Sequence, residues 1–234
     1  MLIKSIHHIL QAVILVVFII PGNVYSADSA LCGDIIVTPA RDGGGPWDYR
    51  DPINRRPSQD ATNKGGRLQL VEGAHFTKEV ESLIKGKSGW LIGDIDYTLF
   101  RFPNHHRALR AMSKLQIKND GKLPARPGAP PEKRYAECYF ERAIAFRPDD
   151  YIVHMLYGIH LHLSGEYKKA EKRYQYAEVH IKDSSELFNN MGLLYYEMGN
   201  YKKSLNYAKK AYSLGYPLPG LKNKLIAEGQ WKDK

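Results

Sequence analysis

The chain has 234 residues, 43% of them hydrophobic, and a formal net charge of +9. This length allows one or two modest domains, and the hydrophobic fraction is typical of a folded protein rather than a disordered one. The positive charge would suggest nucleic acid in a cytosolic protein. In an exported protein it favours a solvated basic face, with peripheral contact to anionic envelope components as the alternative.

The first 26 residues have the pattern of a secretory signal peptide. Residues 9–20 are apolar apart from Gln11, a turn follows at Pro21, and Ser26 supplies a small residue at a cleavage point. The apolar run is shorter than the roughly 20 residues that a membrane-spanning helix needs. We therefore expect an exported, periplasmic protein, with an uncleaved anchor in the inner membrane as the alternative.

We expect residues 27–76 to be irregular, because Gly, Pro, Asn and Asp are frequent there and favour turns. Short extended strips could form at residues 35–37 and 68–71. Trp47 and Tyr49 are aromatic residues inside this polar segment. They either fasten the segment onto the helices or form a platform for a ligand, and we favour the first interpretation.

Cys32 and Cys138 are the two cysteines of the chain. In an oxidising compartment an even pair is compatible with a disulfide bond, which would hold the N-terminal segment against the helical part. Two free thiols are the alternative.

Apolar residues at helical spacing begin after Thr77, whose hydroxyl can cap a helix N-terminus. We expect three helices within residues 77–118. The first follows Thr77, the second covers 90–100 and stops before Pro103, and the third covers 105–118.

A Pro/Gly-rich insertion over 119–132 cannot be helical and should form a mobile surface loop. Helix resumes over 133–150. Residues 151–184 and 185–218 then each contain two helical patterns separated by a turn. A last helix over 219–229 should cover the open end of the stack.

These two segments are related by a shift of 34 residues. Four residues show this period: Gly158, Gly165, Tyr167 and Ala177 recur as Gly192, Gly199, Tyr201 and Ala211. A fixed period of this length indicates stacked units that bury apolar surface against their neighbours.

The pattern resembles the tetratricopeptide repeat, a 34-residue helix–turn–helix unit with glycine at its eighth position and small residues where its second helix packs. Gly158 and Gly192 match the glycine position, and Ala170 and Ala177 match the small positions. Residues 77–118 and 133–150 would be degenerate or interrupted units. The sequence departs from the pattern at His154, Lys182 and Ala208.

The resemblance implies an all-α, right-handed helical-repeat solenoid that follows an irregular N-terminal segment. The first helices of successive units would line a concave groove, which suits an extended or helical segment of a partner. The groove residues implied are Ile152, Met155, Ile159, His162, Glu186, Asn189, Leu193 and Tyr196.

The sequence carries no GxSxG, phosphate-loop or CxxC motif. His154, His160 and His162 lack the i, i+4 spacing of a helical metal pair, and the spacing of Asp94 and Asp96 places them on different sides of a helix. We therefore expect no catalytic residue, metal, cofactor or nucleic acid, with an enzyme active site within residues 27–103 as a minor alternative.

These observations favour a non-catalytic adaptor or scaffold in the cell envelope that binds a protein partner in the groove. A different class of function stays open. The protein could bind anionic or glycan envelope ligands, with Trp47, Tyr49 and Trp90 stacking on sugar rings and surface lysines meeting anions.

Overall fold

The computed structural model describes residues 32, 37, 44–57, 66–125 and 135–232. Within these ranges the regular elements are ten α-helices and one short 3-10 helix, without a strand, so the chain is all-α as expected. The predicted signal segment 1–26 and residues 35–36 lie outside the described ranges. In chain order the helices are η1 (Pro52–Arg55), α2 (Gly66–His75), α3 (Lys78–Glu81), α4 (Leu91–Arg101), α5 (His106–Lys118), α6 (Ala136–Phe146), α7 (Tyr151–Leu163), α8 (Tyr167–His180), α9 (Ser185–Glu197), α10 (Tyr201–Ser213) and α11 (Gly220–Ala227).

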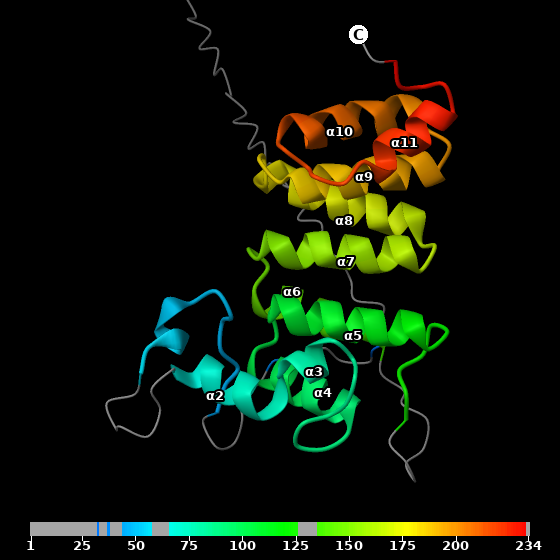
Figure 1. The fold of residues 1–234 in the computed structure, drawn as a ribbon. Helices are drawn as coiled ribbons and strands as arrows, with labels where there is room; N and C mark the ends of the chain where they lie inside the picture. Colours follow the sequence, from blue (N-terminus) through cyan, green and yellow to red (C-terminus); the bar gives the residue numbers. More distant parts are fainter. Residues whose placement is uncertain (1–31, 33–36, 38–43, 58–65, 126–134, 233–234) are drawn as a thin grey trace, which may run out of the picture.

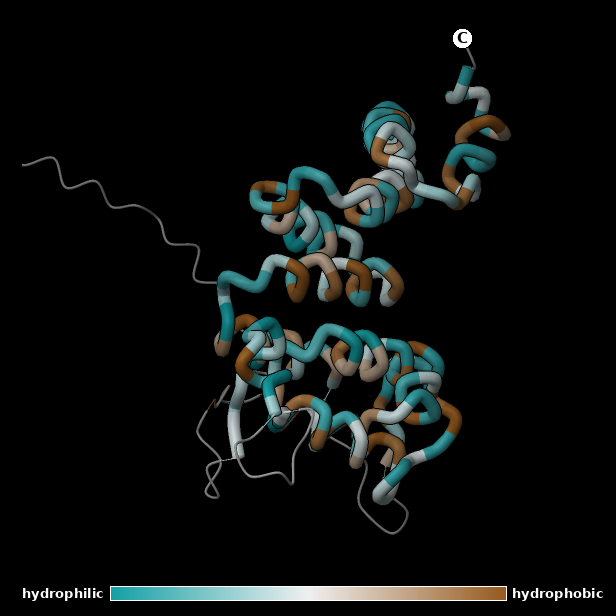
Figure 2. The backbone as a smooth tube through the Cα atoms, turned by 60° about the vertical axis from the view of Figure 1, so that its left-hand side comes forward, coloured by the Kyte–Doolittle hydropathy of each residue, from teal (hydrophilic) through white to brown (hydrophobic). Residues whose placement is uncertain are grey.

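The helices stack on one another in chain order, from α2 at one end to α11 at the other (Figure 1). Helix α7 packs against α5 and α9, and also against α6 and α8, so each helix of the middle of the stack contacts its neighbours on both sides. Apolar and polar stretches alternate along these helices rather than forming one continuous apolar run (Figure 2). Most helices therefore bury one side and expose the other, whereas α7 is buried or half-buried over 151–162.

The last two helix pairs have the same construction. Helix α7 begins at Tyr151, and α9 begins 34 positions later at Ser185. The turns inside the two pairs use Gly165 and Gly199, with φ angles of 79° and 70°, as the sequence predicts for a glycine that ends a helix. The small residues expected on the second helices are fully buried in both pairs: Ala170, Ala177, Ser204 and Ala211.

One apolar core runs through the stack from the residues around α3 to α10. Two smaller clusters lie at its ends. At the N-terminal end, Leu68, Val71 and Phe102 pack with Trp47 and Tyr49. At the C-terminal end, residues of α11 pack against α9 and α10.

Three expectations for the N-terminal part are wrong. Residues 68–71 belong to α2, not to an extended strip, because Leu68 and Val71 are three positions apart and share the buried side of a helix. The helix after Thr77 is only one turn long, since Leu83 adopts a left-handed φ of 59°. The side chain of Thr77 makes no capping hydrogen bond there.

Cys32 and Cys138 form a disulfide bond with a Cα–Cα distance of 5.3 Å, which ties the N-terminal segment to α6. The first residues of the insertion, 119–125, are not helical, and Leu123 within them is buried. The insertion therefore starts on the core, and its residues 126–132 lie outside the described ranges.

Candidate functional site

The eight groove residues that the sequence suggests do not form one open surface. Met155 and Asn189 are only 5% and 4% exposed, so they present little area to a partner. Ile152 and Ile159 are half-buried, packed against the main core with part of each side chain exposed. His162 is half-buried, and its ring lies 5.8 Å from the ring of Tyr167 and 6.5 Å from that of Tyr174.

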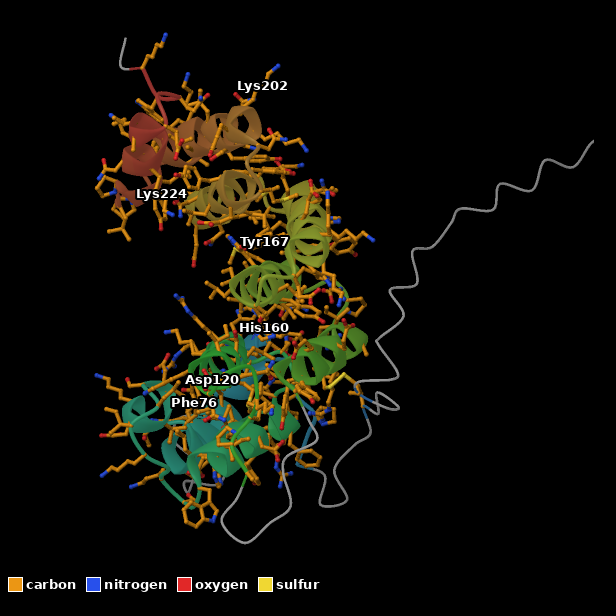
Figure 3. The ribbon with its side chains drawn as sticks, turned by 90° about the vertical axis from the view of Figure 1, so that its right-hand side faces the viewer. Phe76, Asp120, His160, Tyr167, Lys202 and Lys224 are labelled. Atoms are coloured by element: carbon orange, nitrogen blue, oxygen red, sulfur yellow. A yellow bond between two sulfur atoms is a disulfide. The ribbon has the colours of Figure 1, made fainter. Side chains whose placement is uncertain are left out.

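Helix α11 covers the α9 end of the predicted groove. Leu193 and Tyr196 pack with the buried residues of α11. The Tyr196 hydroxyl donates a hydrogen bond to Glu228 Oε1 at 3.0 Å, and the ammonium of Lys224 lies 4.8 Å from the centre of its ring. The position of Lys224 over this part of the stack is seen in Figure 3. The chain's own C-terminal helix therefore occupies the place that a partner would take at these two residues.

A row of cations on α5 was not among the predicted groove residues. Arg107, Arg110, Lys114 and Lys118 are exposed and follow one another at spacings of three and four residues, so they lie along one side of the helix. The opposite side of α5 is buried in the core. Such a row is visible in the sequence once the helix and its buried side are known.

The ion pair of Arg110 shows where this row lies relative to the later helices. Its Nη1 atom is 4.0 Å from Oε1 of Glu186, which belongs to α9. Helix α7 lies between α5 and α9 and contacts both. The pair therefore passes over the outward side of α7, which places the α5 row, the outward residues of α7 and the start of α9 on one surface.

We call this surface the α5–α7–α9 face. It is defined by its outward residues Arg110, Lys114, Lys118, Ile152, Ile159 and Glu186.

The positive charge of this face is only partly neutralised. Arg107, which precedes the face in the α5 row, is held by Glu81 and Glu72, and its hydrogen bond to Glu81 raises the pKa of the guanidinium and lowers that of the Glu81 carboxyl. The Arg110–Glu186 pair is long, and both side chains are about half exposed. Lys114 and Lys118 have no carboxylate partner among the described residues. The face therefore carries unpaired positive charge beside half-buried apolar side chains.

A buried polar network fixes the start of α5. The Asn104 amide donates to Asp48 at 2.7 Å and to Asp150 at 2.8 Å, and His106 lies 2.9 Å from Asp150. Burial raises the pKa of Asp48, but hydrogen bonds from Arg50 and Asn104 outweigh it and hold the pKa at about 2. These groups are occupied with one another, so the network positions helices rather than offering free acid–base groups.

The histidines of α7 occupy separate environments. His154 is buried 4.3 Å from the ring of Tyr176, while His160 Nδ1 lies 2.9 Å from the Ser113 hydroxyl. Asp94 and Asp96 likewise have different neighbours: Asp94 bonds to His75, and Asp96 accepts from the Tyr139 hydroxyl. In the part of the chain that the structure describes, no group of these residues could hold a metal ion.

The three aromatic residues considered for sugar stacking do not form one group, because Trp47 and Tyr49 pack against the cluster of Leu68, Val71 and Phe102 and Trp90 is not part of it. Trp47 packs on Phe102 with a ring distance of 5.4 Å, and Tyr49 packs on His105 at 4.2 Å. Trp90 is 57% exposed at the start of α4. The first two fasten the N-terminal segment to the stack, so the arrangement does not form one stacking platform.

Comparisons with protein-family models, curated proteins and solved structures found no match to this chain. Within the described ranges, no helix has the length and apolarity needed to cross a membrane. The assignment of a function therefore depends on the surface chemistry of the stack itself.

Proposed function

We propose that this protein is a non-catalytic interaction adaptor whose α5–α7–α9 face binds an acidic segment of a protein partner. The observation that carries this proposal is the row of Arg110, Lys114 and Lys118 beside the partly exposed Ile152 and Ile159. The partner segment would place carboxylates along α5 and apolar side chains over α7.

The proposal treats the stack as a tetratricopeptide-like solenoid. Two features support this interpretation. The α7–α8 and α9–α10 pairs begin at positions 34 residues apart and turn at equivalent glycines. Small buried residues also lie where the helices of each pair meet, as the repeat requires. In such stacks the first helices of successive units share one surface, which suits an elongated ligand.

The energetics favour a segment over a single contact. An exposed ion pair contributes only about 0.2–1 kcal/mol, so one lysine would give little affinity. A partner that meets several cations and also covers the exposed parts of Ile152 and Ile159 would add apolar burial, at roughly 25 cal/mol per Å². The charged row would mainly set the orientation and the rate of association, and both would weaken with added salt.

We place the adaptor in the cell envelope. The apolar segment near the N-terminus supports export, and the Cys32–Cys138 disulfide is of the kind that persists in oxidising compartments. Fusion of residues 1–30 to a reporter that folds only after export would test the location. Activity of the reporter in the periplasm is the expected result, and activity only in the cytoplasm would contradict it.

The binding experiment uses two labelled peptides of equal length, one alternating Glu and Leu and the other Lys and Leu, with fluorescence anisotropy as the readout. We expect the acidic peptide to bind and the basic peptide not to. The double change Lys114→Glu and Lys118→Glu should lower the affinity for the acidic peptide at least tenfold, because it reverses the charge of these two positions in the row.

The matched control is Lys202→Glu with Lys209→Glu. These two lysines are exposed on α10, outside the α5–α7–α9 face, and the control changes the net charge by the same amount. Equal loss of binding in both double variants would show that only overall charge matters. That result would reject the α5–α7–α9 face as the binding site.

A further inference from the structure

The loop between α3 and α4, residues 82–90, exposes large apolar side chains. We call it the α3–α4 loop, and it lies at the end of the stack away from α10 and α11 (Figure 1). Ile84 is 71% exposed and Trp90 is 57% exposed, and no other large apolar side chain in the described ranges is as exposed as Ile84. Single exposed apolar residues are common on protein surfaces, but two of this size in one short loop point to an interaction.

The α3–α4 loop folds back tightly on itself. A Cβ atom added to Gly86 would lie 2.0 Å from the carbonyl oxygen of Gly89 and 3.0 Å from the amide nitrogen of Leu91. Only glycine allows the backbone to approach itself so closely. Trp90 stands between Gly89 and Leu91 in the chain, and Ile84 is two positions before Gly86. The contact therefore brings the two exposed apolar residues to the same part of the loop.

The loop is also fixed to the helices beneath it. The buried Asp94 of α4 accepts hydrogen bonds at Oδ2 from the amide of Lys87 at 2.6 Å and from that of Ser88 at 3.1 Å. The Ser88 hydroxyl donates to the Ala74 carbonyl of α2. Leu83 packs against the main core. Because the loop is held in this shape, it loses little conformational freedom when its exposed residues meet another surface.

Positive charge accompanies the apolar residues of the loop. Lys85 and Lys87 are exposed and form no ion pair with a carboxylate of the described residues. The segment from the start of α3 to the end of the loop contains three lysines and two glutamates. Arg107 of α5 neutralises one of these glutamates, Glu81, and the other, Glu79, is exposed. Cations therefore exceed free carboxylates around the two apolar side chains.

We infer that the α3–α4 loop docks onto an anionic lipid surface. Trp90 and Ile84 enter the headgroup region, and Lys85 and Lys87 meet the lipid phosphates. Tryptophan suits this depth because its ring is largely apolar while its indole N–H can stay hydrated. Apolar burial and attraction to anionic lipids add to each other in such binding. Two apolar side chains cover far less than the roughly 1,000 Å² that a specific protein interface needs, which favours lipid over a protein partner.

Cosedimentation of the full, disulfide-bonded chain with lipid vesicles tests this inference. We expect binding to vesicles of phosphatidylglycerol and phosphatidylcholine in equal parts, weaker binding to phosphatidylcholine alone, and a loss of affinity with added salt. Ile84→Gln should lower the affinity for the mixed vesicles about tenfold, because it removes apolar area from the contact. Leu218→Gln is the matched control, since Leu218 is 62% exposed after α10, at the other end of the stack, and should not affect binding.

A second pair of variants tests the role of the lysines. Lys85→Gln with Lys87→Gln should lower the affinity for the mixed vesicles about tenfold and reduce its dependence on salt. Lys202→Gln with Lys209→Gln changes the net charge by the same amount at exposed positions of α10 and should have a smaller effect. Equal losses in the two double variants would overturn the inference, because binding would then follow overall charge and not the loop.

Tryptophan fluorescence shows which residue enters the lipid. The chain has three tryptophans, and bromine on the lipid acyl chains quenches a tryptophan that inserts among them. We expect partial quenching in the wild type and none in Trp90→Phe, which keeps an aromatic ring and should still bind. Quenching that persists in Trp90→Phe would overturn the inference, as would unchanged affinity in Ile84→Gln or absence of binding to both kinds of vesicle. Dimerisation that Ile84→Gln abolishes, without vesicle binding, would instead assign the loop to a contact between two copies of the chain.

Discussion

Gly158 and Gly192 hold equivalent positions in the two repeats, yet the structure predicts different consequences when each is replaced by alanine. A Cβ atom added at Gly158 would lie 2.5 Å from Cδ1 of the Tyr174 ring. Tyr174 is fully buried, so its ring cannot move aside without disturbing the core. At Gly192 the nearest atom is Cδ2 of Leu221, also at 2.5 Å, but this is the end of a flexible side chain on α11.

The magnitude follows from two opposing effects. Glycine inside a helix is less favourable than alanine by about 1 kcal/mol, which stabilises either variant. Overpacking a rigid core costs about 1–3 kcal/mol, and a contact this short against a buried ring belongs at the upper end. We expect Gly158→Ala to lower the free energy of unfolding by about 2 kcal/mol, and Gly192→Ala to change it by less than about 1 kcal/mol.

Urea denaturation of the disulfide-bonded protein, followed by circular dichroism, measures these differences. Gly73→Ala on α2 serves as the control, because no described atom beyond its chain neighbours and the backbone of its own helix lies within 4 Å of its added Cβ. Gly73→Ala should raise the urea concentration at the unfolding midpoint only by the amount that follows from the higher helix propensity of alanine. The reasoning is refuted if Gly158→Ala is as stable as the wild type, or if Gly192→Ala is the more damaging of the two.

Three further predictions concern the disulfide bond, a buried histidine and a buried ion pair. Cys32 and Cys138 are 106 residues apart, so replacing both by serine should lower the free energy of unfolding by up to about 4–5 kcal/mol in denaturant titrations; a loss below 1 kcal/mol would contradict this. Burial, with the nearby charge of Arg173, lowers the pKa of His154 from 6.5 to about 4. Between pH 6.5 and 4 the imidazole of His154 is therefore protonated in the unfolded chain but neutral in the folded one. The free energy of unfolding should fall by up to about 3 kcal/mol as the pH drops across this range. His154→Leu should reduce the dependence of the measured free energy of unfolding on pH. Arg173 pairs with the buried Glu141, so Glu141→Ala should lower the free energy of unfolding by about 3–5 kcal/mol in thermal or urea denaturation. Adding Arg173→Met should restore part of that stability, because it removes the charge that the first change leaves unpaired. Further destabilisation by the second change would argue against the pair.

The stacked helices could be predicted from the sequence because their signals are local. Glycines at the turns, and apolar residues at helical spacing, place α7 and α9 close to their observed ends. Helix α2 could not be predicted in this way. It contains Gly73 and only a weak apolar pattern, so its helical state depends on the packing of Leu68 and Val71 near Phe102, a contact distant in the sequence.

The candidate site was less accessible to prediction. The sequence suggests a groove from the two regular repeats alone, and it includes Met155 and Asn189, which pack inward. A periodic pattern shows that a position is equivalent in two repeats, but it does not show what covers that position. Tyr196 is covered because the last helix, α11, folds back onto α9. No local feature of the sequence specifies the direction in which this helix turns.

The cover by α11 also limits how a partner can lie on the stack. With Leu193 and Tyr196 already occupied, the open part of the α5–α7–α9 face extends from the row on α5 across Ile152 and Ile159. Its charge is asymmetric, because Lys114 and Lys118 on α5 have no carboxylate partner among the described residues, and Glu186 lies on α9. A segment bound there would meet favourable charge only with its carboxylates toward α5. Opposite charges at the two edges of one face can therefore select the orientation of a partner, even where each exposed pair adds little affinity.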